Sequence, residues 1–135
     1  MEKDERLKQV GGDHYEQMAV EPFEIAETMQ LTPMQFTVLK YVSRWRRKNG
    51  VEDLRKAMQT CRKAHLYYCN MPTTYREERP TDKLMIRMYC AVNGLGEDER
   101  VVLTNVVSNR FTSAASRLEG MIVGEEAMKS ERLEQ

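Results

Sequence analysis

Positive charge gathers in one stretch of the sequence, from Lys40 to Lys63. The stretch holds nine basic residues against two acidic ones, Glu52 and Asp53, although the whole chain has a formal net charge of zero. The basic residues are Lys40, Arg44, Arg46, Arg47, Lys48, Arg55, Lys56, Arg62 and Lys63. Guanidinium and ammonium groups that converge on a concave surface attract phosphate and other polyanions. The chemistry that these residues predict is therefore anion binding.

Two of the basic residues have the spacing of a phosphate grip. Lys40 and Arg44 are one helical turn apart, so they could contact adjacent oxygens, Arg44 through a bidentate fork and Lys40 as a point charge. Lys56, on the next predicted helix, would neutralise phosphate with them. A solvated helix face accounts for the Lys40 and Arg44 pair about equally well, and both interpretations stay open.

Further candidates flank this pair. His14 and Tyr15 precede the first predicted helix, where the imidazole could donate to phosphate or transfer a proton and the phenol ring could stack on a base. A simple packing role for the two residues is the alternative. Asp53 either positions Arg44 or Lys48 across a turn or caps its own helix.

A helical hairpin is predicted to carry most of these residues. Its first arm begins with Thr32 as N-cap, Pro33 at the first helical position and Gln35 to complete a capping box. Apolar residues then recur at helical spacing, at Met34, Val38, Val42 and Trp45. Trp45 is thus expected in the core, and Asn49-Gly50 should supply the left-handed geometry that ends the arm.

The second arm starts with Glu52 and Asp53 in its first turn, where the helix dipole favours acidic side chains. It should end near Asn70, before Pro72. Its predicted apolar side consists of Leu54, Ala57 or Met58, Cys61, His65 and Tyr68. The basic residues then lie on the outer sides of both arms.

The hairpin belongs to a predicted domain over residues 13–70. Residues 1–12 should form a flexible arm, and a short helix should start at Glu21-Pro22, since proline suits a first helical position. Residues 71–81 hold two prolines among polar residues, which predicts a linker and the main internal boundary.

Residues 82–124 are predicted as a C-terminal helical extension. A helix over 82–92 should be followed by one long, Val-rich helix that continues through Asn109 to Met121, because apolar residues step by three or four throughout. The paired valines could favour a strand instead, but the helical period holds for five turns. Residues 125–135 are polar and are expected to fray.

Length and composition predict a small all-α protein. The chain has 135 residues, 41% hydrophobic and 31% charged, which fits one globular domain with an appendage. A leader peptide or a membrane-spanning stretch is not recognisable, so a cytoplasmic location is expected. The three cysteines, Cys61, Cys69 and Cys90, lack metal-ligand spacing and are predicted to be reduced core thiols.

Familiar enzyme signatures are missing from the sequence. It contains no G-x-x-x-x-G-K-[ST] phosphate loop, no G-x-G-x-x-G and no H-E-x-x-H. A helical Mg²⁺-dependent pyrophosphohydrolase needs several converging carboxylates, and the hairpin offers only Glu52 and Asp53. Glu21, Glu24 and Glu27 could add ligands, but we predict no metal site, and nucleotide chemistry would need another design.

Several short elements, in order, resemble the small phage domain called SaV-like. They are Asp13-His14-Tyr15, Glu21-Pro22, Gln30-Leu31-Thr32, Lys40-Tyr41-Val42-Ser43-Arg44, Lys48-Asn49-Gly50 and Glu52-Asp53-Leu54-Arg55-Lys56-Ala57. The resemblance covers roughly residues 12 to 68. A member of that family in T7-like phages is a nucleoside monophosphate kinase without a conventional phosphate loop. The resemblance thus implies a phage origin and nucleotide binding, with a nucleoside triphosphate as donor if the chain is a kinase.

The chain departs from this resemblance in two places. Family members commonly carry Gly-Asn shortly before the Lys-Tyr pair, where this sequence reads Phe36-Thr37, and the segment after residue 70 has no counterpart. Two hypotheses follow. In the first, the protein binds a deoxynucleoside monophosphate, with Lys40, Arg44 and Lys56 on the phosphate, and transfers phosphate to it. In the second, it is a non-enzymatic phage accessory or anti-defence protein that binds a host protein or sequesters a nucleotide.

Partners follow from the same observations. Nucleic-acid binding through the basic hairpin is disfavoured, since the chain has zero net charge and a pI near 6.7. Self-association into a homo-oligomer is expected through the long Val-rich helix. A membrane partner is not expected.

Overall fold

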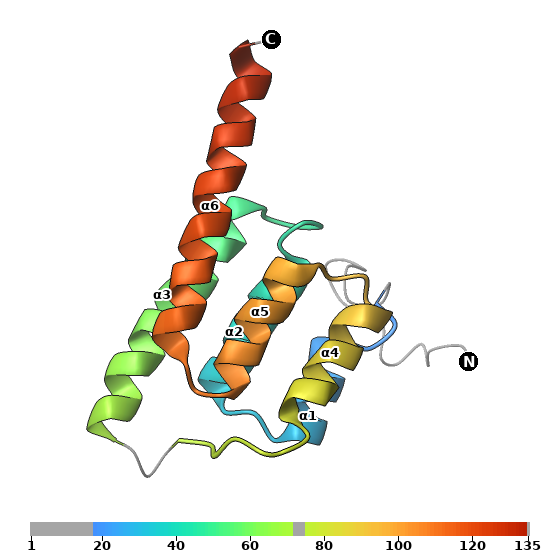
Figure 1. The fold of residues 1–135 in the computed structure, drawn as a ribbon, viewed down its shortest axis with the longest axis vertical. Helices are drawn as coiled ribbons and strands as arrows, with labels where there is room; N and C mark the ends of the chain where they lie inside the picture. The colour runs from blue at the N-terminus through green and yellow to red at the C-terminus, as the bar shows by residue number, and fades with distance from the viewer. Residues whose placement is uncertain (1–17, 72–74, 135) are drawn as a thin grey trace.

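The computed structural model describes residues 18–71 and 75–134, and this part of the chain folds into six α-helices (Figure 1). The helices are α1 (Pro22–Met29), α2 (Pro33–Arg44), α3 (Val51–Asn70), α4 (Asp82–Val92), α5 (Glu97–Val107) and α6 (Phe111–Glu134). The predicted all-α class is confirmed. The α2–α3 hairpin and a helical C-terminal extension are both present.

Local signals place the beginnings of α1 and α2 where the sequence predicts them. Pro22 and Pro33 occupy the first turns of the two helices. Thr32 Oγ1 accepts from the Gln35 N–H at 3.2 Å, and Gln35 Oε1 accepts from the Thr32 N–H at 3.0 Å, which completes the capping box. Gln35 also donates through Nε2 to the Val106 carbonyl at 3.1 Å. This capping residue therefore ties α2 to α5.

The end of α2 differs from the prediction. The helix stops at Arg44, and the next residues form turns in which the Lys48 N–H donates to the Arg44 carbonyl at 3.1 Å and the Gly50 N–H to the Trp45 carbonyl at 2.7 Å. Gly50, with φ of +57°, is the N-cap residue before α3. Trp45 is buried as expected, because the turn directs it into the core. Lys48 consequently lies in this turn and not on α2.

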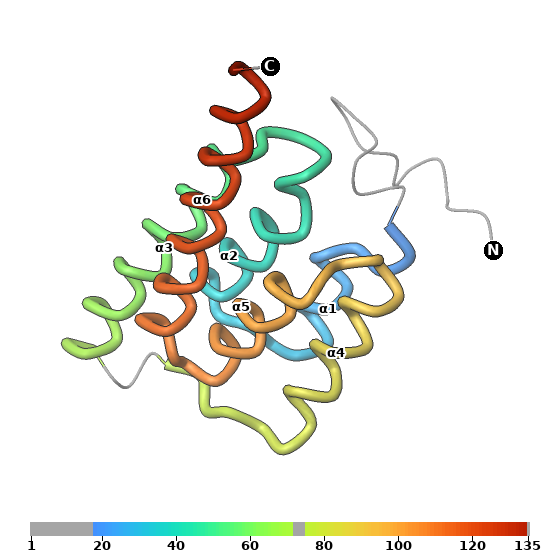
Figure 2. Tube along the Cα trace, turned by 45° about the horizontal axis from the view of Figure 1, so that its top comes forward, coloured from blue at the N-terminus to red at the C-terminus, as the bar shows by residue number. Residues whose placement is uncertain are grey.

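One hydrophobic core joins helices from both sides of the predicted linker. It includes Val38 and Leu54 of the hairpin and Leu103 and Leu118 of the extension. The helices α3 and α6 lie side by side in both views (Figures 1 and 2), and α2 packs against α3 and α5. The extension therefore supplies part of the core around the hairpin. The predicted domain boundary over residues 71–81 stays a prediction.

The segment between α3 and α4 is anchored by a buried arginine. Arg76 donates through Nε to the Met29 carbonyl at 2.9 Å, and its two terminal nitrogens contact Asp82 at 2.8 and 2.7 Å. Both side chains are nearly inaccessible to solvent. The described part of this segment is thus fixed to α1 and α4.

The prediction of one long helix through Asn109 is wrong. The chain turns at Asn109, which has φ of +61°, so that α5 ends at Val107 and α6 begins at Phe111 and runs back along it. The Asn109 side chain donates to the Arg76 carbonyl at 2.5 Å. Apolar spacing continued across the turn because both helices face the same core. The valines Val102, Val106 and Val107 are buried there, so these three side chains are not exposed for self-association, which stays a prediction.

Other details of the C-terminal half and of α3 also differ from expectation. The helix α6 continues past Gly124 to Glu134, where fraying was expected, and its last turns project beyond the other helices (Figure 1). His65 and Cys69 are exposed, whereas Ala64 takes the buried position on α3. Burial raises the pKa of Cys61 to about 12, and burial with the nearby charge of Glu99 raises that of Cys90 to about 11. Of the described helices, none is apolar over a length sufficient to cross a bilayer.

Candidate functional site

Three of the predicted phosphate-binding residues meet at the ring of Tyr41. Lys40 Nζ lies 4.8 Å from the ring centroid, the Arg44 guanidinium carbon 4.9 Å and Lys56 Nζ 5.7 Å. We call these four residues the Tyr41 cluster. The electron-rich face of an aromatic ring attracts cations, so Tyr41 offsets part of the repulsion among three like charges. The cluster joins α2 to α3 and concentrates positive charge at one point of the hairpin.

Asp53 fixes the arginine of the cluster. Its Oδ2 accepts from Arg44 Nε at 3.1 Å and its Oδ1 from an Arg44 terminal nitrogen at 3.2 Å, a bidentate pair. The Asp53 side chain is fully buried and Arg44 is nearly so. Asn49 Nδ2 adds a contact to Asp53 Oδ1 at 3.4 Å. Of the two interpretations of Asp53, the structure shows the contact with Arg44 across the turn.

The two lysines of the cluster differ from Arg44 in their surroundings. Lys40 and Lys56 are half-buried, and among the described residues no acidic side chain forms an ion pair with either of them. An ammonium group carries three hydrogen-bond donors. The donors of these two groups are therefore the part of the cluster best suited to hold an anion.

The remaining predicted residues do not join the cluster in the described structure. Lys48 is exposed in the turn between α2 and α3, outside the cation contacts to Tyr41. His14 and Tyr15 lie outside the described residues. Sequence reasoning missed Tyr41 as a site residue, although its place next to Lys40 and one turn before Arg44 was the available signal.

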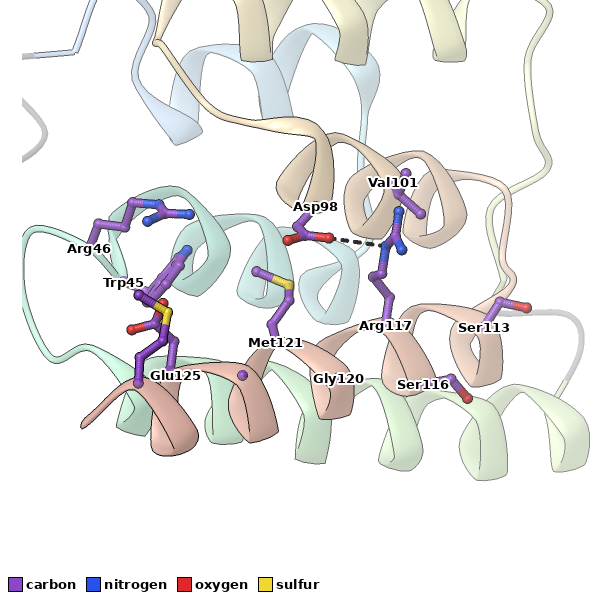
Figure 3. Close-up of a pocket in the computed structure, with 12 residues that line it drawn as sticks. Trp45, Arg46, Asp98, Val101, Ser113, Ser116, Arg117, Gly120, Met121 and Glu125 are labelled. Carbon is purple, nitrogen blue, oxygen red and sulfur yellow. Dashed lines mark ion pairs between the residues drawn. The ribbon is translucent and has the colours of Figure 1, made fainter. Parts of the chain in front are cut away.

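A wide cleft lies elsewhere, between α6, the start of α5 and the turn after α2 (Figure 3). Its volume is about 860 Å³, and an ion pair between Arg117 Nε and Asp98 Oδ1, at 3.3 Å, crosses it. The lining residues are Trp45, Arg46, Asp98, Val101, Ser113, Ser116, Arg117, Gly120, Met121, Gly124, Glu125 and Met128. Of the predicted site residues within the described part of the chain, none is among them.

Glu99 supports one wall of this cleft and was not singled out from the sequence. Its Oε1 accepts from Trp45 Nε1 at 3.1 Å and from Arg46 Nε at 3.0 Å, and the Arg46 guanidinium stacks 4.3 Å from the Trp45 ring centroid. Glu99 Oε2 is buried and lacks a hydrogen-bond partner among the described residues. In the sequence, Glu99 was indistinguishable from an ordinary acid in the first turn of a helix.

Groups of three or more His, Cys, Asp or Glu residues placed to hold a metal ion are not found within residues 18–71 and 75–134.

Comparison with known proteins gives one family match. Residues 10–62 match the model of a family described as a protein of unknown function, DUF3310. The matched segment is less than half of the chain and contains the whole Tyr41 cluster together with Asp53. A search of curated proteins and a search of solved structures each returned no match.

Proposed function

We propose that this protein binds a deoxynucleoside monophosphate through its phosphate at the Tyr41 cluster. The observation that carries the proposal is the convergence of Lys40, Lys56 and Arg44 on one ring, while neither lysine has an acidic partner among the described residues. A phosphate dianion between such groups forms charge-assisted hydrogen bonds and removes their mutual repulsion. The resemblance to SaV-like phage proteins supports a nucleotide as the source of that phosphate.

Each residue of the cluster has a distinct role in this proposal. Lys40 and Lys56 contact phosphate oxygens, because their ammonium donors are not used by acidic neighbours in the described structure. Arg44, held by the buried Asp53, contributes a positive charge whose position does not change on binding. His14 and Tyr15 would orient the nucleotide.

The proposal extends to catalysis as a nucleoside monophosphate kinase. In that reaction a bound nucleoside triphosphate loses its γ-phosphoryl group as the P–O bond to the β-phosphate breaks, and a phosphate oxygen of the monophosphate forms the new P–O bond. Two nucleoside diphosphates result. Purified protein incubated with mixed deoxynucleoside monophosphates and triphosphates should then yield diphosphates.

A second candidate function is that of a non-enzymatic phage accessory protein that sequesters a nucleotide or binds a host protein. Phe36 stacks on Phe23 with ring centroids 4.9 Å apart, at a position where SaV-like proteins commonly carry glycine. A backbone that a ligand could approach is thereby covered by an aromatic pair. Nucleotide binding without any diphosphate product would favour this candidate over the kinase.

The binding proposal is tested by removing both lysines and leaving Arg44 in place. Loss of Arg44 would leave Asp53 buried without its partner and would confound binding with stability. Hydrogen bonds to charged groups contribute about 1.5–3 kcal/mol each, so Lys40→Ala with Lys56→Ala should weaken monophosphate binding by at least about a hundredfold. Isothermal titration calorimetry with the four deoxynucleoside monophosphates measures this loss.

The matched control is Lys83→Ala with Arg87→Ala. These two exposed residues of α4 lie one turn apart, so the control removes the same charge from another helix. It should bind as the unaltered protein does. Equal affinity in the lysine variant and the control, with both folded by circular dichroism, would show that the Tyr41 cluster is not the phosphate site.

A further inference from the structure

The helix α6 presents a row of small residues to the cleft of Figure 3. Ser113, Ser116, Gly120 and Gly124 lie at successive turns, and Ala127 continues the row on the exposed end of the helix. A Cβ added at Gly120 or Gly124 would meet no atom within 4 Å. Glycine inside a helix costs roughly 1 kcal/mol relative to alanine, and the described residues leave the resulting space open. A second helix could approach this face closely.

The last turns of the same helix lack cover. Residues 126–134 are exposed, and in Figure 1 the last turns of α6 project beyond the other helices. It carries apolar side chains nonetheless, with Met128 exposed by 47% and Leu133 by 81%. Helix ends of this kind gain most of their stability from packing rather than from propensity.

We infer that two copies of the chain pair through antiparallel α6 helices that cross at Gly124. The projecting end of each helix lies in the cleft of the other copy. In this register Met128 of one copy faces Gly120 of the other, so a large side chain fills the space above a glycine. Glu131 likewise faces Arg117. The occupant of the cleft is therefore a second copy of the same helix.

Charge along α6 favours this arrangement over a parallel one. In the proposed register Glu131 of one copy faces Arg117 of the other, and two-fold symmetry repeats this contact on the other side of Gly124. Antiparallel pairing thus brings opposite charges together at two symmetric places. Parallel pairing would place like charges together, and it would also align the two helix dipoles unfavourably.

The Arg117 guanidinium can serve both contacts. Its ion pair with Asp98, at 3.3 Å, is about half exposed on both sides, so the group remains reachable from the cleft. A carboxylate from Glu131 of the second copy would share this guanidinium, which has five donors.

The crossing point is tested by a cysteine at Gly124 in a Cys69→Ser background. A residue on a two-fold axis meets its own copy, and small neighbours let the two Cα atoms come within the roughly 7 Å that a disulfide spans. The other native thiols, Cys61 and Cys90, are buried. Gly124→Cys should give a disulfide-linked dimer on mild oxidation, seen on a non-reducing gel.

The matched control is Ser130→Cys in the same background. In the proposed register the two cysteines at position 130 are offset by twelve residues, about 18 Å along the helix, and should not crosslink. Light scattering should give the unaltered protein twice the 15.8 kDa mass of one chain. A monomer at every concentration would overturn the inference, and so would a dimer in which Ser130→Cys crosslinks and Gly124→Cys does not.

A charge exchange adds an independent readout. Arg117→Glu and Glu131→Arg should each raise the dissociation constant of the dimer, which sedimentation measures. The double variant should restore the dimer, because the opposite charges then face each other again. Failure of the double variant to recover the dimer, with its helix content unchanged, would refute the pairing of these residues.

Discussion

Buried ion pairs in this protein hold backbone segments in place, and Arg76 with Asp82 is the clearest case. Burial alone would raise the pKa of Asp82, but hydrogen bonds from Arg76 and from the Arg79 N–H, with the charges of both arginines, lower it below its ordinary value of 3.8. The ionised carboxylate is thus stabilised in the folded state. The contribution of this carboxylate to the free energy of unfolding is complete above pH 3.8. It disappears as the pH falls through the lower pKa that the group has in the folded state.

Asp82→Asn should therefore destabilise the protein in a pH-dependent way. At neutral pH the variant leaves Arg76 buried without its partner, for an expected loss of about 3–5 kcal/mol in the free energy of unfolding. Urea denaturation at pH 7 and at several acidic pH values measures the difference from the unaltered protein. The difference in the free energy of unfolding should narrow below pH 3.8. For the control Glu77→Gln, at an exposed residue, the difference should stay near zero. A difference that is constant over the whole range would contradict this account.

At the residue scale, the sequence was sufficient to predict some of the residues that meet in the candidate site. The spacing of Lys40, Arg44 and Lys56 on two antiparallel arms was enough to predict that they share a surface, and the structure brings them to one ring. The sequence did not decide whether Asp53 forms an ion pair with Arg44, because an acidic residue at this position could equally cap its own helix. Glu99 contacts Trp45, which is 54 residues away in the sequence, and local sequence patterns do not predict contacts at such a separation.

The ends of helices were predictable from the sequence where residues close in the chain determine them. The capping box of Thr32 and Gln35 is such a local signal, and α2 begins there. The break at Asn109 is not local, because its side chain is held by Gln35 and by the Arg76 carbonyl, both remote in sequence. The apolar period could not reveal the break, since α5 and α6 bury their apolar faces in the same core.

The turn between α2 and α3 depends on one glycine. Gly50 has φ of +57° and ψ of −134°, a conformation that side chains with a Cβ rarely adopt, while a Cβ there would meet no atom within 4 Å. Gly50→Ala should thus cost about 1–3 kcal/mol through backbone strain alone. The exposed Lys48→Ala in the same turn should cost less than about 0.5 kcal/mol. Chemical denaturation compares the two, and equal stability would show that the turn tolerates a side chain.

At the scale of the whole molecule, the two proposed contacts lie on different helices. The extension α4–α6 packs on α2 and α3 and completes the core, and its last helix borders the cleft proposed as a dimer contact. The Tyr41 cluster is built from α2 and α3 alone and lies within the segment that matches the DUF3310 family. The proposed anion binding and the proposed self-association therefore involve separate residues and can be tested by separate mutations.

The most direct test of the central claim is a titration of isotope-labelled protein with each deoxynucleoside monophosphate, followed by two-dimensional NMR. If the phosphate binds at the Tyr41 cluster, one or more of the four nucleotides should shift the amide signals of Lys40, Tyr41 and Lys56 and their neighbours in a saturable way, with smaller shifts for inorganic phosphate. Signals that stay unmoved around Tyr41, or that move instead around Trp45 and Arg117 in the cleft, would contradict it.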